Sequence, residues 1–371
     1  MYGSLQSVGH TMDYFIRHTG KLVIFIVMPR VNNTSNILRV YLEGALIEER
    51  SVRSSNHIFL YYVLWWFYHS YFLLKYIHPE ESAIVFVGHP LALVGMSIMK
   101  KVRRLTYAYW VGDYFPPVRW SLTLYEKLKK YYHDHISITY YLSDAINMIM
   151  NGKIMNQENK RTVMWGVKVK SLPSERLRAS KSKAKSEKEE VRQEFRLLFV
   201  GVVRLSQGLE DIFSYLVTHR DVRLRVVGVC EANLYATYKK MIDALGISGQ
   251  VNFPNSFLND EELTELAREH HVGVAVYDKS RRSSTYYTDP GKVKTYVDLG
   301  LPVIMTNTSA IAPFIQKYQA GVVIDEVREL PDAVEEIKNH YARYQRGLQV
   351  FARHFEYEAY YKQAFVALQR G

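Results

Sequence analysis

The stretch that decides the fold is DPGKVKTYVDLGLPVIMT, residues 289–306. Pro290 and the glycine after it predict a loop, and a helix is expected to start near Lys292. Gly300 then separates this helix from an apolar run that is typical of a buried strand. A helix N-terminus beside lysines favours anion binding and suits a diphosphate. An ordinary helix–strand connection would give the same pattern.

The segments before this stretch alternate in the same way. RLLFVG (196–201) predicts a strand that ends in glycine, and residues 208–219 have apolar side chains at helical spacing. A second strand and a second helix are predicted over 222–230 and 232–246, and the apolar runs QVNFPN, HVGVAVY and LPVIMTN continue the series. We expect an α/β fold with a doubly wound sheet, whose ligands bind at the carboxyl ends of the strands.

The first 170 residues show a similar alternation. Short apolar runs end in breakers or turns, which is typical of buried parallel strands with helices between them. They lie at 21–29, 82–90, 104–117, 135–143 and 160–167, and a helix ended by Gly152 is predicted over 144–152. Residues 1–15 resemble a loop that leads from a strand into a helix, so that the first strand is missing or the fold begins late.

Composition indicates two globular domains and a linker. The 371 residues are 48% hydrophobic and 23% charged, enough to bury two cores. Residues 171–195 are rich in Lys, Glu and Ser and poor in large apolar side chains, so we expect an exposed linker between domains at 1–170 and 196–350. The single cysteine, Cys230, excludes an internal disulfide framework, and no leader pattern opens the chain. We expect a cytoplasmic protein.

Charge is uneven along the chain. Residues 1–170 hold 20 Lys/Arg against 11 Asp/Glu, whereas residues 196–371 hold 21 of each. This asymmetry predicts two different partners, although a basic surface can also serve solubility alone. We find no helix-turn-helix, zinc-ligand or RNA-recognition signature, so nucleic acid is not an expected partner.

An aromatic stretch, HIFLYYVLWWFYHSYFLLKYIHP, spans residues 57–79. It is long enough to cross a bilayer, but it contains His69 and Lys75 and many Tyr and Trp, which favour the headgroup level. We rank a helix with one membrane-touching face first, a buried core helix second and a membrane span last. Nearby lysines and arginines at 100–104 and 127–130 would complement an anionic leaflet.

Residues 290–304 resemble the donor-site segment of GT-B glycosyltransferases similar to retaining family 4, P-x-K-x-x-E-Y followed by G-x-P-V-I. Residues 197–213, LLFVGVVRLSQGLEDIF, resemble the family's phosphate loop, G-R-x-x-x-x-K-G. The resemblance implies two Rossmann-like domains facing a central cleft, a nucleotide-sugar donor in the second, and a C-terminal helix (351–371) that returns to the first. The implied donor-binding residues are Gly201, Arg204, Gln207, Gly208, Asp289, Pro290, Lys292, Lys294 and Thr295.

The chain departs from the family at charged positions. Val202 and Gln207 replace the family's arginine and lysine, and Tyr287 and Thr295 replace its two glutamates. Arg204, Lys292 and Lys294 are the candidates to supply the lost positive charge. Asp289 is the chosen sugar or ribose contact, and a helix cap is an equally good interpretation of it.

In the first half, VGHPLALVGM and YAYWVGDYFP resemble the family's histidine loop and T-V-H-D-x-x-P segment. Gly112 replaces the second histidine, which leaves His89 and Asp113 as candidate catalytic or acceptor-side residues. A satisfied core histidine and a loop-capping aspartate would look the same. No Asp-x-Asp triplet or His/Cys ligand spacing predicts a metal, so no metal or cofactor is expected.

We therefore expect a hexosyltransferase-like enzyme, retaining and metal-independent. Its donor is a nucleotide sugar, and its acceptor an anionic, lipid-linked or surface-polysaccharide precursor at the inner face of the plasma membrane. The alternative is a non-catalytic GT-B partner subunit that binds glycan or membrane, which the losses at Val202, Gln207, Thr295 and Gly112 motivate.

Overall fold

The computed structural model describes residues 5–26, 35–55, 57–168, 194–277 and 284–369. The chain forms two compact units, the first built mainly from residues 8–164 and 357–371, the second from 165–356. The predicted linker at 171–195 lies almost entirely outside the described residues, as does part of the loop at 278–288.

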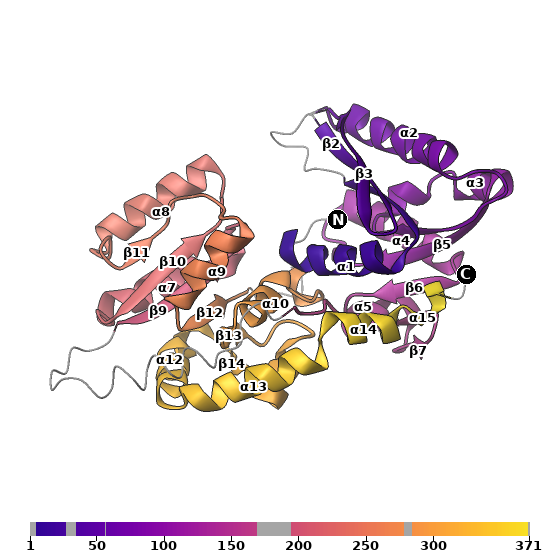
Figure 1. Ribbon diagram of the computed structural model, residues 1–371. Coiled ribbons are helices and arrows are strands. Elements are labelled where there is room, and N and C mark those ends of the chain that lie inside the picture. The colour runs from indigo at the N-terminus through magenta and orange to yellow at the C-terminus, as the bar shows by residue number, and fades with distance from the viewer. Residues whose placement is uncertain (1–4, 27–34, 56, 169–193, 278–283, 370–371) are drawn as a thin grey trace. The chain divides into compact units, whose positions relative to one another are not determined.

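The first unit contains a five-stranded sheet in the order β4-β5-β6-β8-β7, of which Figure 1 labels β5, β6 and β7. Strands β4 (Ser82–Val87), β5 (Arg104–Val111), β6 (Ile138–Tyr141) and β8 (Lys160–Thr162) are parallel, and β7 (Asn156–Gln157) pairs antiparallel with β8. The helices of this unit are α1 (Leu5–His18), α2 (Ile58–Tyr76), α3 (Met96–Val102), α4 (Trp120–Asp134), α5 (Asp144–Asn151), α14 (Tyr357–Ala364) and α15 (Val366–Gln369).

Phe365, between α14 and α15, is buried in the aromatic core of the first unit. Its ring centroid lies 5.9 Å from that of Phe86 in β4, 5.6 Å from that of Trp110 in β5 and 5.1 Å from that of Tyr140 in β6. The C-terminal segment therefore packs on three strands that come from the N-terminal half of the chain.

A separate antiparallel meander precedes α2, formed by β1 (Lys21–Ile26), β2 (Ser35–Leu42) and β3 (Ala45–Arg53). The prediction of a parallel strand at 21–29 is therefore wrong in direction. A short apolar run predicts a buried strand but says nothing of the direction of its neighbour. Phe72 of α2 packs against Leu38 and Val52, so α2 covers one face of the meander.

The second unit is a six-stranded parallel sheet in the order β11-β10-β9-β12-β13-β14. The strands are β9 (Phe195–Val200), β10 (Val222–Val227), β11 (Val251–Asn252), β12 (Val272–Ala275), β13 (Val303–Thr306) and β14 (Gly321–Ile324). The helices are α7 (Leu209–Thr218), α8 (Ala232–Ala244), α9 (Asp260–Arg268), α10 (Gly291–Asp298), α11 (Ala312–Tyr318), α12 (Leu330–Asn339) and α13 (Tyr341–His354). The predicted doubly wound α/β fold is confirmed here.

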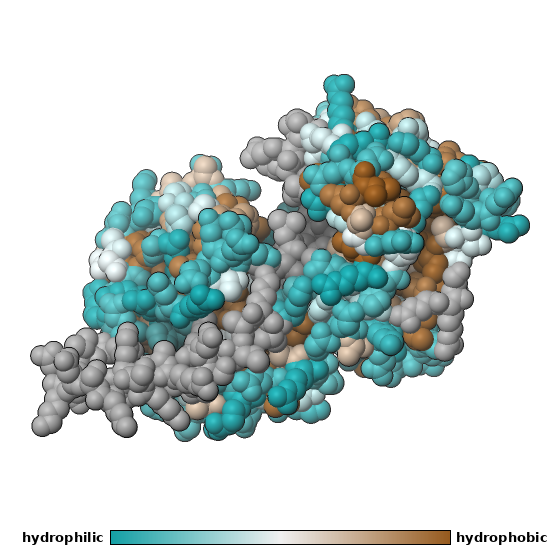
Figure 2. Space-filling view, viewed as in Figure 1, coloured by the Kyte–Doolittle hydropathy of each residue, from teal (hydrophilic) through white to brown (hydrophobic). Residues whose placement is uncertain are grey.

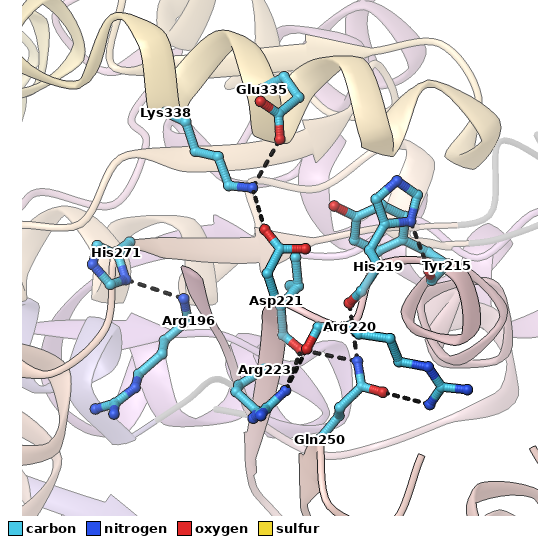
Figure 3. Close-up of polar contacts among 11 residues, drawn as sticks. Arg196, Tyr215, His219, Arg220, Asp221, Arg223, Gln250, His271, Glu335 and Lys338 are labelled. Atoms are coloured by element: carbon cyan, nitrogen blue, oxygen red, sulfur yellow. Dashed lines mark hydrogen bonds and ion pairs between the residues drawn. The ribbon is translucent and has the colours of Figure 1, made fainter. Parts of the chain in front are cut away.

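Polar contacts fix the amino-terminal end of this sheet (Figure 3). The Gln250 side chain donates to the carbonyl oxygens of Leu216, His219 and Val222 at 3.0–3.1 Å. Lys338 of α12 reaches Asp221 at 3.1 Å, just before β10. Because these groups satisfy one another's hydrogen-bonding capacity, the amino-terminal end of the sheet has a structural role. In folds of this type, ligands bind at the opposite, carboxyl-terminal end of the strands.

Close packing between β12 and α10 gives a test of this architecture. A Cβ atom added at Gly273 would lie 2.2 Å from the Tyr296 ring, whereas one at Gly249 has nothing within 4 Å. We expect Gly273→Ala to lower the free energy of unfolding by at least about 2 kcal/mol through overpacking. Gly249→Ala is the control and should stay within about 0.5 kcal/mol of the parent in urea unfolding. Equal stability of the two variants would contradict the packing.

Candidate functional site

The order of the strands reverses between β9 and β12. From β9 the chain continues outward through β10 and β11 on one side, and through β12, β13 and β14 on the other. Such a switch point leaves a crevice outside the carboxyl ends of the two central strands, where α/β proteins bind their ligands. The Tyr296 hydroxyl joins these strands, since it accepts from the Val200 amide at 3.0 Å and donates to the Val274 carbonyl at 2.8 Å.

Two glycines shape the loop between β9 and α7. Gly201 has φ of +121° and Gly208 has φ of +62°, both in the region that favours glycine. A Cβ atom on Gly208 would lie 2.4 Å from Cγ1 of Val276, which follows β12. The start of α7 is therefore held against the end of β12. The N-cap residue of this helix, Gly208, has no side chain that could cap it, so the first amides can serve an anion.

The Lys292 side chain lies at the same point. A Cβ atom on Gly201 would lie 3.7 Å from its Cε. Its Nζ is 3.9 Å from the ring centroid of Phe199 in β9 and 5.2 Å from that of Tyr277 after β12. The residue is only 9% exposed, and its Nζ has no hydrogen-bond partner among the described residues. This is a buried cation between two aromatic rings.

Burial disfavours the charged form of this amine. Burial, with a smaller contribution from the positive charge of Arg204, lowers the pKa of Lys292 to about 7. Two ring faces offset only part of the lost hydration. An anion that reached Nζ would therefore stabilise the ammonium form and gain more from it than from a solvated lysine.

Lys294, two residues later, has its partners inside the second unit. Its Nζ donates to the Trp165 carbonyl at 2.8 Å and lies 3.5 Å from Oδ2 of Asp289. It packs over Phe355 and Phe351, not over the rings that contact Lys292. The structure does not bring the two lysines together, and the positive charge of Lys294 is matched by Asp289.

Asp289 contacts Trp165, where the main segment of the second unit begins. Its Oδ2 accepts from the Trp165 amide at 2.9 Å, and no side chain caps α10, so the helix-cap interpretation is wrong. Burial raises its pKa, which the charge of Lys294 opposes. Its Oδ1 has no hydrogen-bond partner among the described residues, so this oxygen remains available for the predicted sugar or ribose contact.

Two of the remaining predicted donor residues, Gln207 and Thr295, form hydrogen bonds with nearby backbone groups. Gln207 is buried, and its Oε1 accepts from the Arg204 amide at 3.3 Å, while the Arg204 side chain is exposed. Pro290 immediately precedes α10. Thr295 is buried and donates to the Gly291 carbonyl at 3.2 Å. The structure thus gathers Gly201, Gly208, Lys292 and the loop of Arg204 at the switch point.

Asp113 and His89 lie in the first unit, after β5 and β4. The Asp113 carbonyl accepts from buried Lys129 at 2.6 Å, while Glu126 pairs with the same lysine at 2.7 Å. His89 packs between the rings of Trp65 and Tyr125, with centroids at 4.5 and 5.5 Å. Burial lowers its pKa to about 4, so the imidazole is neutral at pH 7.

Sequence reasoning missed three groups at the carboxyl edge of the second sheet. Phe199 and Tyr277, which contact Lys292, resembled core residues in apolar runs. Ser309 follows β13 and is buried, and its Oγ has no partner among the described residues. The cluster Thr306-Asn307-Thr308-Ser309 after an apolar strand was a signal that could have indicated it. No group of three or more potential metal-binding His, Cys, Asp or Glu side chains occurs within the described ranges.

Residues 220–368 match the family model described as glucosyltransferase 3-like, C-terminal domain. No curated protein matches the sequence. Among solved structures, the chain is similar to Anabaena HepE in complex with UDP, with 14% identity, a TM-score of 0.61 and 81% of each chain covered.

Two further structures are similar. The UDP-forming α,α-trehalose-phosphate synthase of Burkholderia vietnamiensis has 14% identity and a TM-score of 0.55, with 83% of this chain and 77% of that chain covered. The pneumococcal O-GlcNAc transferase GtfA, in complex with UDP and GlcNAc, has 10% identity and a TM-score of 0.59, with 91% and 64% covered.

The chain has the GT-B fold. At these identities, the solved structures establish the fold alone. The family match over 220–368, together with this fold, indicates a glycosyltransferase. The closer resemblance to family 4 stays a prediction.

The buried amine predicts an unusual dependence of stability on pH. Because the pKa of Lys292 is lower in the folded than in the unfolded chain, the unfolded chain binds more protons between about pH 7 and 10.5. This residue therefore costs most stability below pH 7, and the cost declines as the pH rises. We expect Lys292→Met to raise the free energy of unfolding by about 3–5 kcal/mol at pH 6 and by about 1 kcal/mol at pH 10.

Lys294→Met is the matched control on the same helix. It should lose about 3–5 kcal/mol, because it leaves the Asp289 carboxylate buried without its cation. Denaturant unfolding of both variants from pH 6 to 10 measures this contrast. A Lys292→Met variant that is less stable than the parent at pH 6 would contradict the assigned environment.

Proposed function

We propose that the protein transfers a sugar from a nucleotide-sugar donor, held by the second unit, to a membrane-associated acceptor. The observation that carries this proposal is the buried ammonium group of Lys292 at the switch point. UDP is the proposed nucleotide, because the similar structures of HepE and GtfA contain it.

The proposed role of this site is to stabilise the departing diphosphate. Negative charge develops on the diphosphate as the bond to the sugar breaks, and pre-positioned donors stabilise it without reorganisation. Lys292 Nζ and the first amides of α7 are such donors, and exposed Arg204 can close over the outer phosphate. We propose that these groups neutralise the leaving group without a metal ion.

The proposed acceptor is a lipid-linked or surface-polysaccharide precursor with anionic groups, at the inner face of the membrane. The excess of Lys and Arg in residues 1–170 supports an anionic partner for the first unit. Asp113 and neutral His89 are the proposed acceptor-side groups, because each follows the carboxyl end of a parallel strand of that unit. Retention of configuration is proposed on the family 4 resemblance.

A non-catalytic partner subunit is the second candidate. The observation that favours it is Gln207, which stands where the family has a lysine and whose side chain serves the Arg204 backbone. Such a subunit need not hold a nucleotide at all. Nucleotide binding therefore separates the two candidates.

The proposed function predicts stabilisation by a nucleoside diphosphate. UDP at 100 times its Kd should add about 2.7 kcal/mol, which raises the Tm by about 5–10 °C. The shift should persist in EDTA and should disappear in Lys292→Met, while Lys240→Ala on α8 keeps it. Thermal unfolding with a panel of nucleoside diphosphates makes the measurement. No shift with any nucleotide would reject the donor site and favour the partner subunit.

A further inference from the structure

Helix α2 has two apolar sides, and the described residues of its unit cover only one of them. Tyr61, Trp65 and Phe72 are buried on the inner side, where Phe72 packs against the meander. The outer side carries large hydrophobic residues at helical spacing. These exposed residues are Phe59, Leu60, Tyr62, Val63, Trp66, Phe67, Tyr71 and Leu74, and Phe59 is 72% exposed.

The same surface continues onto α3. The Trp66 indole donates to the Val94 carbonyl at 2.7 Å, which ties α2 to the segment that leads into α3. Ile98 and Val102 of α3 are 67% and 48% exposed, and Lys100 and Lys101 between them are exposed as well. We call the exposed side chains of α2 together with Ile98 and Val102 the outer face.

Apolar surface extends beyond α2 in this unit. Leu42, Leu46 and Ile47 at the turn between β2 and β3 are about half exposed or more. Figure 2 shows a brown apolar patch on this unit, in the area where Figure 1 draws β3. Clustered exposed apolar side chains of this kind indicate a protein or membrane interface.

The composition of the outer face favours a bilayer. Tyr and Trp place an apolar ring in the hydrocarbon and a polar tip among headgroups. Lysines beside an apolar helix add attraction to anionic lipids. An isologous contact between two copies would bring the same lysine-bearing patch to both sides, and two units with an excess of positive charge would repel.

We propose that the outer face docks on an anionic lipid bilayer, with α2 lying in the plane of the headgroups. No described helix is long and apolar enough to cross a membrane, so α2 would lie on the bilayer and not span it. This inference deepens the proposed function, because it supplies the surface at which a lipid-linked acceptor would be met. Its evidence is independent of the donor site.

The experiment is co-sedimentation of the full chain with vesicles of phosphatidylcholine, with and without 30% phosphatidylglycerol. The parent should bind the anionic vesicles, and binding should weaken as salt is raised. Lys100→Ala/Lys101→Ala should lower the partition coefficient about 25-fold, since each lysine near an anionic surface contributes about fivefold. Phe59→Ser/Phe67→Ser should lower it at least about tenfold through lost apolar insertion.

Matched controls come from the second unit. Lys239→Ala/Lys240→Ala on α8 and Phe257→Ser/Val350→Ser also change exposed lysines and exposed apolar side chains, and these variants should bind as the parent does. Equal losses in test and control pairs, or parent binding that ignores phosphatidylglycerol, would overturn the proposal. The proposal would also be overturned if the Phe59→Ser/Phe67→Ser variant still bound vesicles but changed from a dimer to a monomer in analytical ultracentrifugation.

The two proposals fail separately. The Tm shift with UDP is measured on the same Phe59→Ser/Phe67→Ser variant, and should be unchanged. Lost vesicle binding with a retained shift supports docking through the outer face. If vesicle binding and the Tm shift are both retained, docking through the outer face is rejected, while the proposed donor site is still supported.

Discussion

A single ammonium group is held at the switch point of the second sheet, away from water and between two aromatic rings. Lys292 has no hydrogen-bond partner among the described residues, and burial lowers its pKa to about 7. A group so placed weakens the folded state unless an anion joins it. Residues that lower the stability of the folded protein in this way are retained at binding sites, where they interact with the ligand. Gly201 and Gly208 leave room for an anion at this point, and the uncapped start of α7 offers it amide donors. Both features are consistent with an anion-binding role.

Helix α10 carries this lysine and also fixes the segment where the chain leaves the first unit. Asp289 and Lys294 bind the backbone of Trp165, and Asp298 accepts from the Lys168 amide at 2.6 Å. The Val167 amide donates to the Phe355 carbonyl at 2.8 Å, two residues before the chain returns to the first unit at Tyr357. Helix α10 thus carries the proposed donor-binding lysine on one side, and on the other it contacts the segments where the chain leaves and re-enters the first unit. The charges that were expected to act together, Lys292 and Lys294, are divided between these two tasks.

Local signals in the sequence were sufficient to predict the elements around the proposed donor site. Pro290, Gly300 and the apolar run after it mark α10 and β13 because breakers and hydrophobic runs act over a few residues. The direction of β1 was mispredicted, since it depends on pairing with β2 and not on its own residues. Long-range contacts were equally hidden. Trp165 lies 124 residues before Asp289, and Phe199 lies in a strand that looks like any other core strand. A helix with one membrane-touching face was the first-ranked interpretation of the aromatic stretch at 57–79, whose composition also suits a core helix, and it stays a prediction.

Proton uptake on nucleotide binding tests the central claim most directly. If a diphosphate holds Lys292 in its charged form, an amine that is mostly neutral at pH 8 must take up a proton when UDP binds. Calorimetric titration at pH 8 in buffers of different ionisation enthalpy should show uptake of close to one proton per UDP, and much less at pH 6. Binding of UDP at pH 8 without proton uptake would contradict the account.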